Sequence, residues 1–118
     1  MALNKVMIIG VAGKAPEIRE VNGAKNAFFS VAVTERYKNR DGEVSESTEW
    51  LNISAWRGAA EIAERFVKKG DTVYVEGKWH DRKWTDKSGQ EHHITEVIAD
   101  TIQRLTQKQK QENQDTQF

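Results

Sequence analysis

Apolar and polar residues alternate along much of the first half of the chain, a pattern typical of strands with one buried face. The alternation predicts strands at residues 4–12, 17–21, 26–34 and 44–56. Asn22-Gly23 lies between the second and third of these and favours a tight hairpin turn, because this pair tolerates positive φ. The polar run "ERYKNRDGEVSES", with Asp41-Gly42 near its tip, predicts a long hairpin loop leading to the fourth.

The spacing changes in "RGAAEIAERFVKKG", residues 57–70, where apolar residues recur at helical intervals. One predicted helix face holds Ala59, Ile62, Ala63, Phe66 and Val67. Lys68 and Lys69 would lie at the negative end of the helix dipole, and Gly70 is a natural helix terminator. The segment therefore predicts a single helix of about three turns.

Alternation returns after the helix and predicts strands at 71–84 and 92–104, with a bulge or bend at Gly77. "TDKSGQEH" predicts the hairpin loop between them. Over residues 106–118 aliphatic side chains disappear and glutamine dominates, which predicts a short disordered tail after a domain at 1–105.

With the two arms of the hairpin at 17–21 and 26–34 counted as one strand of the fold, the elements follow the order three strands, one helix, two strands. This is the order of the OB-fold, a five-stranded Greek-key barrel with its helix between strands three and four, whose exposed face binds oligonucleotides or oligosaccharides. We therefore predict an all-β OB-fold barrel with one short helix. Other small barrels with an added helix are the alternative.

Composition narrows the function classes. The 118 residues carry 18 basic and 18 acidic side chains, so an anion-binding surface must be local rather than a general basic coat. The absence of cysteine excludes disulfides and thiolate chemistry. The first apolar run is too short to span a bilayer and lacks the order of a secretory signal, so we expect a soluble protein of the cytoplasm.

Two tryptophans occupy the polar side of an alternating strand. In "TEWLNISAW", Trp50 and Trp56 share a face with small polar residues, so they either form a second buried layer or present a flat surface for stacking. Trp56, beside the start of the helix, is the one expected to be partly packed. Trp79 shares the parity of Val73 and Val75 and is predicted to pack in the core or against another subunit.

Basic and aromatic residues interleave at two places. The strand that ends at Trp84 carries Lys78, His80 and Arg82 on the same side. Tyr37 lies among arginines and a lysine in "RYKNR", for which a solvated loop is the alternative interpretation. Interleaving is typical of single-stranded nucleic-acid binding, because bases stack on rings at roughly 1–3 kcal/mol each and cations neutralise the phosphates. Sequence preference should be slight, because no placed base-reading groups are identified.

Nothing in the sequence indicates catalysis. His92 and His93 are adjacent in a strand and point to opposite faces, and His80 has no partner at ligand spacing, so we expect neither a metal nor a cofactor. Gly13-Lys14 lacks the other residues of a phosphate-binding loop. The acidic residues are spread over exposed positions, which argues against a paired-carboxylate site.

Four segments are specific enough to carry a resemblance: "NKVMIIG", "TEW" at 48–50, "FVKKGDTVYVEGK" at 66–78 and "RKWTDKSGQEHHITEV" at 82–97. In this order they resemble the bacterial-type single-stranded DNA-binding protein family, which acts in replication, recombination and repair. The resemblance implies an OB-fold, a homotetramer whose strands meet across subunits, and DNA wound around the assembly. It also implies base stacking by Tyr37, Trp50, Trp56 and Trp84.

Two features depart from the family. Leu51 follows "TEW" where the family often has histidine, which bears on the subunit interface. The chain ends in "NQDTQF", whereas family members usually end in an acidic tip with proline and phenylalanine that docks replication and repair enzymes. Asp115 and Phe118 are the candidate docking residues here. Such a tail fits a plasmid-, phage- or mobile-element-type variant, or a paralogue that leaves partner recruitment to another copy.

We therefore predict a non-catalytic bacterial protein, associated with the nucleoid, that binds and protects single-stranded DNA with little sequence preference. Phosphate contacts are predicted for Lys5, Arg19, Arg36, Lys38, Arg40, Arg57, Lys78, Arg82, Lys83 and Lys87. The alternatives are a dimeric primosomal accessory protein on the same fold, a protein or oligosaccharide interaction module, and an enzyme such as a nuclease.

Overall fold

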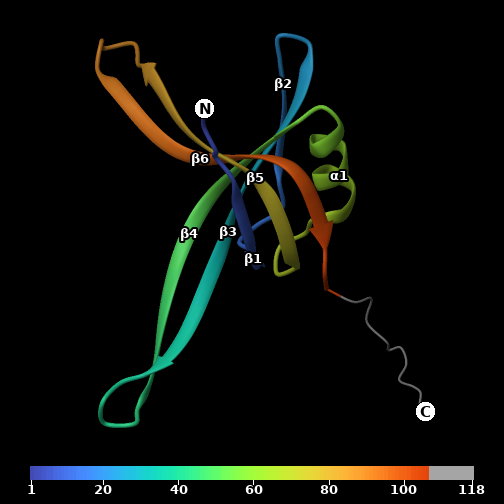
Figure 1. The fold of residues 1–118 in the computed structure, drawn as a ribbon. Helices are drawn as coiled ribbons and strands as arrows, with labels where there is room; N and C mark the ends of the chain where they lie inside the picture. Colours follow the sequence, from blue (N-terminus) through green and yellow to red (C-terminus); the bar gives the residue numbers. More distant parts are fainter. Residues whose placement is uncertain (107–118) are drawn as a thin grey trace, which may run out of the picture.

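The computed structural model describes residues 1–106 and contains six strands and one helix (Figure 1). The elements are β1 (Val6–Ala12), β2 (Glu17–Val21), β3 (Ala24–Lys38), β4 (Val44–Trp56), α1 (Gly58–Phe66), β5 (Thr72–Thr85) and β6 (Glu91–Arg104). Within these residues, no helix has the length and apolar character needed to cross a bilayer.

Five of the strands close into a barrel. The wall runs β1–β5–β6–β4–β3, and β3 returns to β1 through the pair Val11 and Ala32. The β4–β6 pairing is parallel and the others are antiparallel. β2 pairs with β3 and extends the wall outside this ring. When the five strands of this ring are counted along the chain (β1, β3, β4, β5, β6), α1 follows the third strand and precedes the fourth, which confirms the predicted OB-fold.

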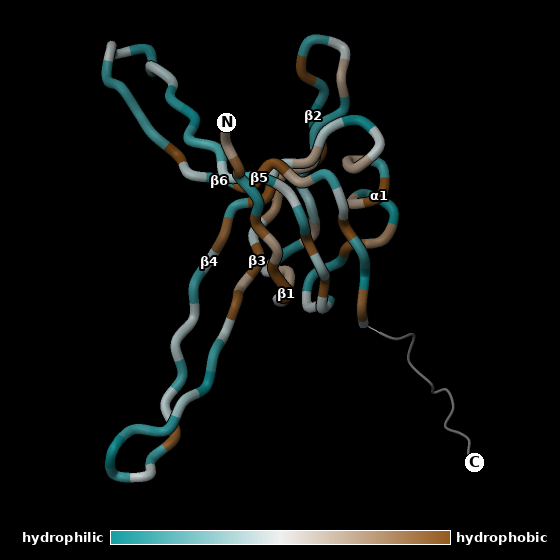
Figure 2. Tube along the Cα trace, in the orientation of Figure 1, coloured by the Kyte–Doolittle hydropathy of each residue, from teal (hydrophilic) through white to brown (hydrophobic). Residues whose placement is uncertain are grey.

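The core lies on the inward face of the barrel strands. Phe29, Val31, Ile53, Val73 and Val75 are fully buried there. Burial of each such side chain contributes about 1.5–3 kcal/mol to folding. Figure 2 shows the apolar segments gathered in the barrel, whereas the outer parts of the β3–β4 and β5–β6 hairpins are mostly polar. We call these two outer parts the β3–β4 arm (residues 34–48) and the β5–β6 arm (residues 81–95).

Two local predictions about glycine positions are confirmed. Asn22 and Gly23 have φ values of 51° and 82°, as the tight hairpin turn between β2 and β3 requires. The β5–β6 register shifts between Glu76 and Gly77, as expected for a bulge. A Cβ at Gly77 would lie 2.1 Å from the backbone oxygen of Ile98, so this close approach of β5 to β6 excludes larger residues.

The β3–β4 loop is shorter than predicted. Residues 35–38 continue β3 instead of forming a loop, because they pair in register with residues 44–47 of β4. Residues 39–43 alone make the connection. The polar sequence concealed this part of β3 because both faces of the arm are exposed, and alternation appears only when one face is buried.

The packed face of α1 also differs from the prediction. The helix ends at Phe66, before Gly70, and buries Ala60 and Ala63. Ile62 and Phe66 remain exposed at 41% and 47%. The two small alanines allow the helix backbone to lie close to the barrel, and this orientation turns the larger side chains toward solvent.

Candidate nucleic-acid interface

Strand pairing brings three of the predicted stacking residues to one face of the sheet. Residues paired directly across neighbouring strands share a face, and the face alternates along each strand. Trp84 of β5 pairs with His92 of β6. Glu96, which shares the parity of His92, pairs with Asn52 of β4. Trp50 and Trp56 have the same parity as Asn52. All three tryptophans therefore lie on the outward side of the barrel wall, which we call the outer face.

All four predicted stacking residues are accessible. The exposed fractions are 61% for Trp50, 54% for Tyr37, 47% for Trp84 and 37% for Trp56. Trp56 is the most covered of the four, as its place beside the helix predicted. The Trp50 ring lies close to Gly13, in the connection after β1. A Cβ at Gly13 would be only 2.7 Å from the ring. None of the rings is sealed in the interior.

Tyr37 lies on the opposite face of the β3–β4 arm. It pairs with Ser45, which has the opposite strand parity to Trp50. A DNA strand that meets both rings would have to pass over the edge of this twisted hairpin. The register of the hairpin decides this arrangement.

A groove of about 400 Å³ opens on the outer face. Its lining includes the aromatic residues Trp56 and Phe28 and the basic residues Arg19 and Arg82. Rings and cations together suit a base with its phosphate. Sequence reasoning missed Phe28, although it alternates with Asn26, Ser30 and Thr34 on the polar side of its strand, which is the signal that drew attention to Trp50 and Trp56.

Buried polar side chains lie in the same groove. Glu96 is 4% exposed, and its carboxylate lies 3.1 Å from His80 Nδ1 and accepts a hydrogen bond from Arg82 Nε at 3.4 Å. Asn26 donates to Ser54 Oγ at 3.1 Å. A buried carboxylate requires such partners, so Glu96 orients the His80 and Arg82 side chains. Within residues 1–106, no three histidine, aspartate or glutamate side chains form a group able to hold a metal ion.

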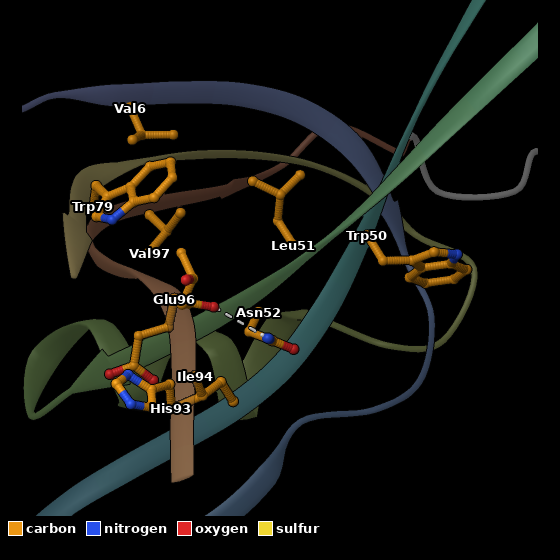
Figure 3. Close-up of a pocket in the computed structure, with 10 residues that line it drawn as sticks. Val6, Trp50, Leu51, Asn52, Trp79, His93, Ile94, Glu96 and Val97 are labelled. Carbon is orange, nitrogen blue, oxygen red and sulfur yellow. Dashed lines mark hydrogen bonds between the residues drawn. The ribbon is translucent and has the colours of Figure 1, made fainter. Parts of the chain in front are cut away.

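Trp79 lies on the inner face, as its parity predicted, but it is 59% exposed, beyond the last β1–β5 pair of Val6 and Gly77. With Val6 and Leu51 it lines an apolar pocket of about 550 Å³ (Figure 3). Figure 3 shows the Trp50 ring pointing away from this group. The core alternative for Trp79 is therefore wrong, and a subunit contact remains a prediction.

Comparison with known proteins identifies the family. Residues 3–105 match the Single-strand binding protein family. The chain belongs to this family. It is 42% identical over 110 residues to single-stranded DNA-binding protein 1 of Xylella fastidiosa (strain 9a5c), covering 92% of this chain and 81% of the relative. It is also 42% identical over 106 residues to the single-stranded DNA-binding protein of Neisseria meningitidis (strain MC58), covering 89% of this chain and 61% of that relative.

A solved structure supports the same assignment. The chain is 34% identical to the protein in the Plasmodium falciparum SSB complex with ssDNA, with a TM-score of 0.78. The similarity covers 90% of this chain and 97% of that one. The barrel of this family member therefore has the architecture of a protein solved with single-stranded DNA.

In this member of the single-strand binding family, most of the other predicted phosphate-binding residues lie on the two arms. Arg36, Lys38 and Arg40 belong to the β3–β4 arm, and Lys78, Lys83 and Lys87 to β5 and the loop before β6. Arg36 and Lys38 share the outer face with Trp50, but Arg36 also donates to Glu46 at 2.9 Å. Lys83 lies on the opposite face from Trp84. Arg57 joins β4 to α1 with a φ of 55°.

Lys5, one of the predicted phosphate-binding residues, forms an ion pair within the protein. Its ammonium group forms an ion pair with Glu76, which also accepts a hydrogen bond from the Tyr74 hydroxyl at 2.6 Å. The hydrogen bond to Glu76 raises the pKa of Lys5 and lowers that of Glu76. The pair lies where Met7 of β1 meets β5, and Lys5 does not line the groove that holds Trp56.

Proposed function

We propose that this protein binds single-stranded DNA with little sequence preference and protects it during replication, recombination and repair, without catalysing a reaction. The observation that supports this most strongly is a single outer face on which Trp50, Trp56 and Trp84 are exposed and Arg19 and Arg82 line a groove. An indole accepts any base because every base has a flat π-face. The relatives named above are named for the same ligand.

We assign base stacking and phosphate neutralisation to different residues according to their side-chain chemistry. Base stacking is assigned to Tyr37, Trp50, Trp56 and Trp84. Phosphate neutralisation is assigned first to Arg19 and Arg82, which line the groove, and then to the basic residues of the two arms. Because the formal net charge is zero, attraction of DNA depends on this local arrangement rather than on the charge of the whole chain.

A fluorescence titration with oligo-dT of graded lengths at two ionic strengths tests this function. We expect quenching of tryptophan emission on binding, and a logarithmic salt slope of about −0.7 for each phosphate neutralised. Double-stranded DNA and an oligosaccharide serve as competitors that should not displace oligo-dT. Salt-independent binding would contradict the phosphate contacts, and unquenched emission would contradict the stacking.

We also propose a homotetramer, supported by the outward side of β1. Met7, Ile9 and Val11 are exposed there at 62%, 57% and 43%. β1 pairs with β3 only at Val11 and Ala12 within the described residues, so most of one strand edge is free for another copy. An apolar strand with a free edge is a common site of self-association.

Light scattering tests this assembly. We expect the wild type to have the mass of four chains and Ile9→Glu to have a smaller mass, because the substitution places a charge in the proposed contact. Val44→Glu is the matched control, since Val44 is 63% exposed at the start of β4 on the β3–β4 arm. A wild-type mass of one or two chains would exclude the tetramer, and a mass of two would favour a dimeric accessory protein.

The proposed location is the bacterial cytoplasm, in association with the nucleoid, and the proposed partners are replication and repair enzymes that dock on Asp115 and Phe118. These two residues lie outside the described part of the chain. A variant that lacks residues 115–118 should bind oligo-dT as the wild type does. It should lose binding to a purified enzyme that recognises the tail of another family member, and retained binding would exclude this docking role.

A further inference from the structure

One face of the Trp84 ring is already covered within the protein. The indole and the His92 imidazole stack with centroids 4.4 Å apart and an angle of 18° between their planes. The two residues are direct cross-strand partners near the end of the β5–β6 arm. Because Trp84 is nevertheless 47% exposed, a flat ligand can approach the ring face that His92 leaves free.

The imidazole is itself held in place by the loop between β5 and β6. His92 Nε2 lies 2.7 Å from Asp86 Oδ2. The other oxygen of this carboxylate accepts hydrogen bonds from the backbone nitrogens of Ser88 at 3.0 Å and Gln90 at 2.9 Å. The hydrogen bond with His92, followed by that from the Ser88 hydroxyl, lowers the pKa of Asp86 to about 2. The carboxylate is therefore anchored to the loop, the imidazole to the carboxylate, and the indole to the imidazole.

We propose that His92 is a positioning residue for base stacking: fixed by Asp86, it holds the Trp84 indole so that one base stacks on the free ring face. This inference rests on the proposed function. An unsupported indole on an exposed arm would exchange between rotamers and lose that freedom when DNA binds. Holding the ring beforehand strengthens binding by about twofold to tenfold, the usual gain from ordering one large side chain in advance.

Three single variants and a short oligo-dT test the positioning role. His92→Ala should weaken binding by about twofold to tenfold. His92→Phe keeps a flat ring beneath Trp84 but loses the hydrogen bond with Asp86, so it should restore part of the affinity that His92→Ala loses. His93→Ala is the matched control, because His93 is the adjacent histidine on the other strand face, with Glu91 as its ion-pair neighbour at 3.9 Å. Circular dichroism should show that every variant is folded at the temperature of the titration, and a His92→Phe affinity no higher than that of His92→Ala would refute the role of the ring.

A double-mutant cycle separates positioning from direct DNA contact. In a Trp84→Ala background, the further change His92→Ala should cost no additional affinity, because there is no indole left to position. A full additional loss would show that His92 contacts DNA by itself and would overturn the inference. Wild-type affinity in Trp84→Ala would also overturn it while leaving single-stranded DNA binding intact. Absence of oligo-dT binding by the wild type would instead remove the proposed function.

Discussion

Strand β3 changes character halfway along its length. Phe29 and Val31 are fully buried in the barrel, whereas every residue from Thr34 to Lys38 is exposed. β5 shows the same change, because Val75 is fully buried and all residues from 81 to 85 are exposed. The barrel and the two arms are therefore built from the same strands in different environments.

The two regions are held together by different interactions. Apolar burial stabilises the barrel, whereas on the β3–β4 arm the cross-strand contacts are polar. The Thr34 and Thr48 hydroxyls lie 2.9 Å apart, and Arg36 pairs with Glu46 at 2.9 Å. Such pairs contribute about 0.2–1 kcal/mol each. The comparison indicates that the barrel contributes most of the stability. The arms, which present the binding groups, should unfold locally at a lower free energy than the barrel.

The largest expected effect is on the stability of the barrel. Phe29→Ala should lower the free energy of unfolding by about 3–5 kcal/mol, because it leaves a cavity among fully buried residues. Denaturant titration measures this change. Val44→Ala, on the β3–β4 arm, should change stability by no more than about 0.5 kcal/mol. Equal effects at the two sites would remove the distinction between barrel and arm.

The next largest effect is on DNA affinity, and it tests whether DNA binds the outer or the inner face of the sheet. Trp50→Ala should weaken oligo-dT binding by about 1–3 kcal/mol, because it removes one stacking ring from the outer face. Trp79→Ala, with its mass checked by light scattering because a subunit contact is predicted there, is the matched control, since Trp79 has almost the same exposure, 59% against 61%, but lies on the inner face. Fluorescence anisotropy with a labelled short oligonucleotide measures both. A larger loss from Trp79→Ala would reverse the assignment of the binding face.

A smaller effect concerns the salt dependence of binding. Arg82→Gln should reduce the steepness of the logarithmic salt slope by about 0.7, because one phosphate contact is lost. Lys69→Gln, in the turn after α1, should leave the slope unchanged. Titrations at four salt concentrations measure the slopes. An unchanged slope in Arg82→Gln would mean that its guanidinium serves Glu96 alone.

The smallest effect is an acid-dependent loss of stability on the β5–β6 arm. Hydrogen bonds lower the pKa of Asp86 to about 2, from an ordinary value near 3.8, so the ionised form stabilises the folded arm. This contribution is present above about pH 4 and is lost as the pH falls toward 2. The stability difference between wild type and Asp86→Asn should therefore shrink over that interval. Denaturant unfolding of both proteins from pH 5 to pH 2 measures this difference. A difference in unfolding free energy that stays constant over this range would refute the prediction.

Much of the fold was predictable because its signals are local. Alternation located the barrel strands, Asn22-Gly23 located the first hairpin turn, and Gly77 located the bulge. The prediction failed where neither face of a strand is buried, as at residues 35–38. It also failed for α1, because the choice between neighbouring helix faces depends on the surface beneath the helix.

The candidate site was only partly predictable. The shared parity of Trp50 and Trp56 follows from one strand, but the position of Tyr37 on the other face depends on the hairpin register. Phe28 had a local signal in its parity with Asn26 and Ser30, whereas the burial of Glu96 had none, since its partners in the groove come from other strands.

By itself, the sequence determined which segments become strands, where the chain turns, and which side chains share a face within one strand. These properties depend on backbone preferences and a two-residue period, so neighbouring residues suffice to specify them. Only the tertiary structure decided that β6 lies between β4 and β5, that Glu96 meets Arg82, and that His92 lies against Trp84. Those contacts join residues from different strands, and the closure of the barrel selects them.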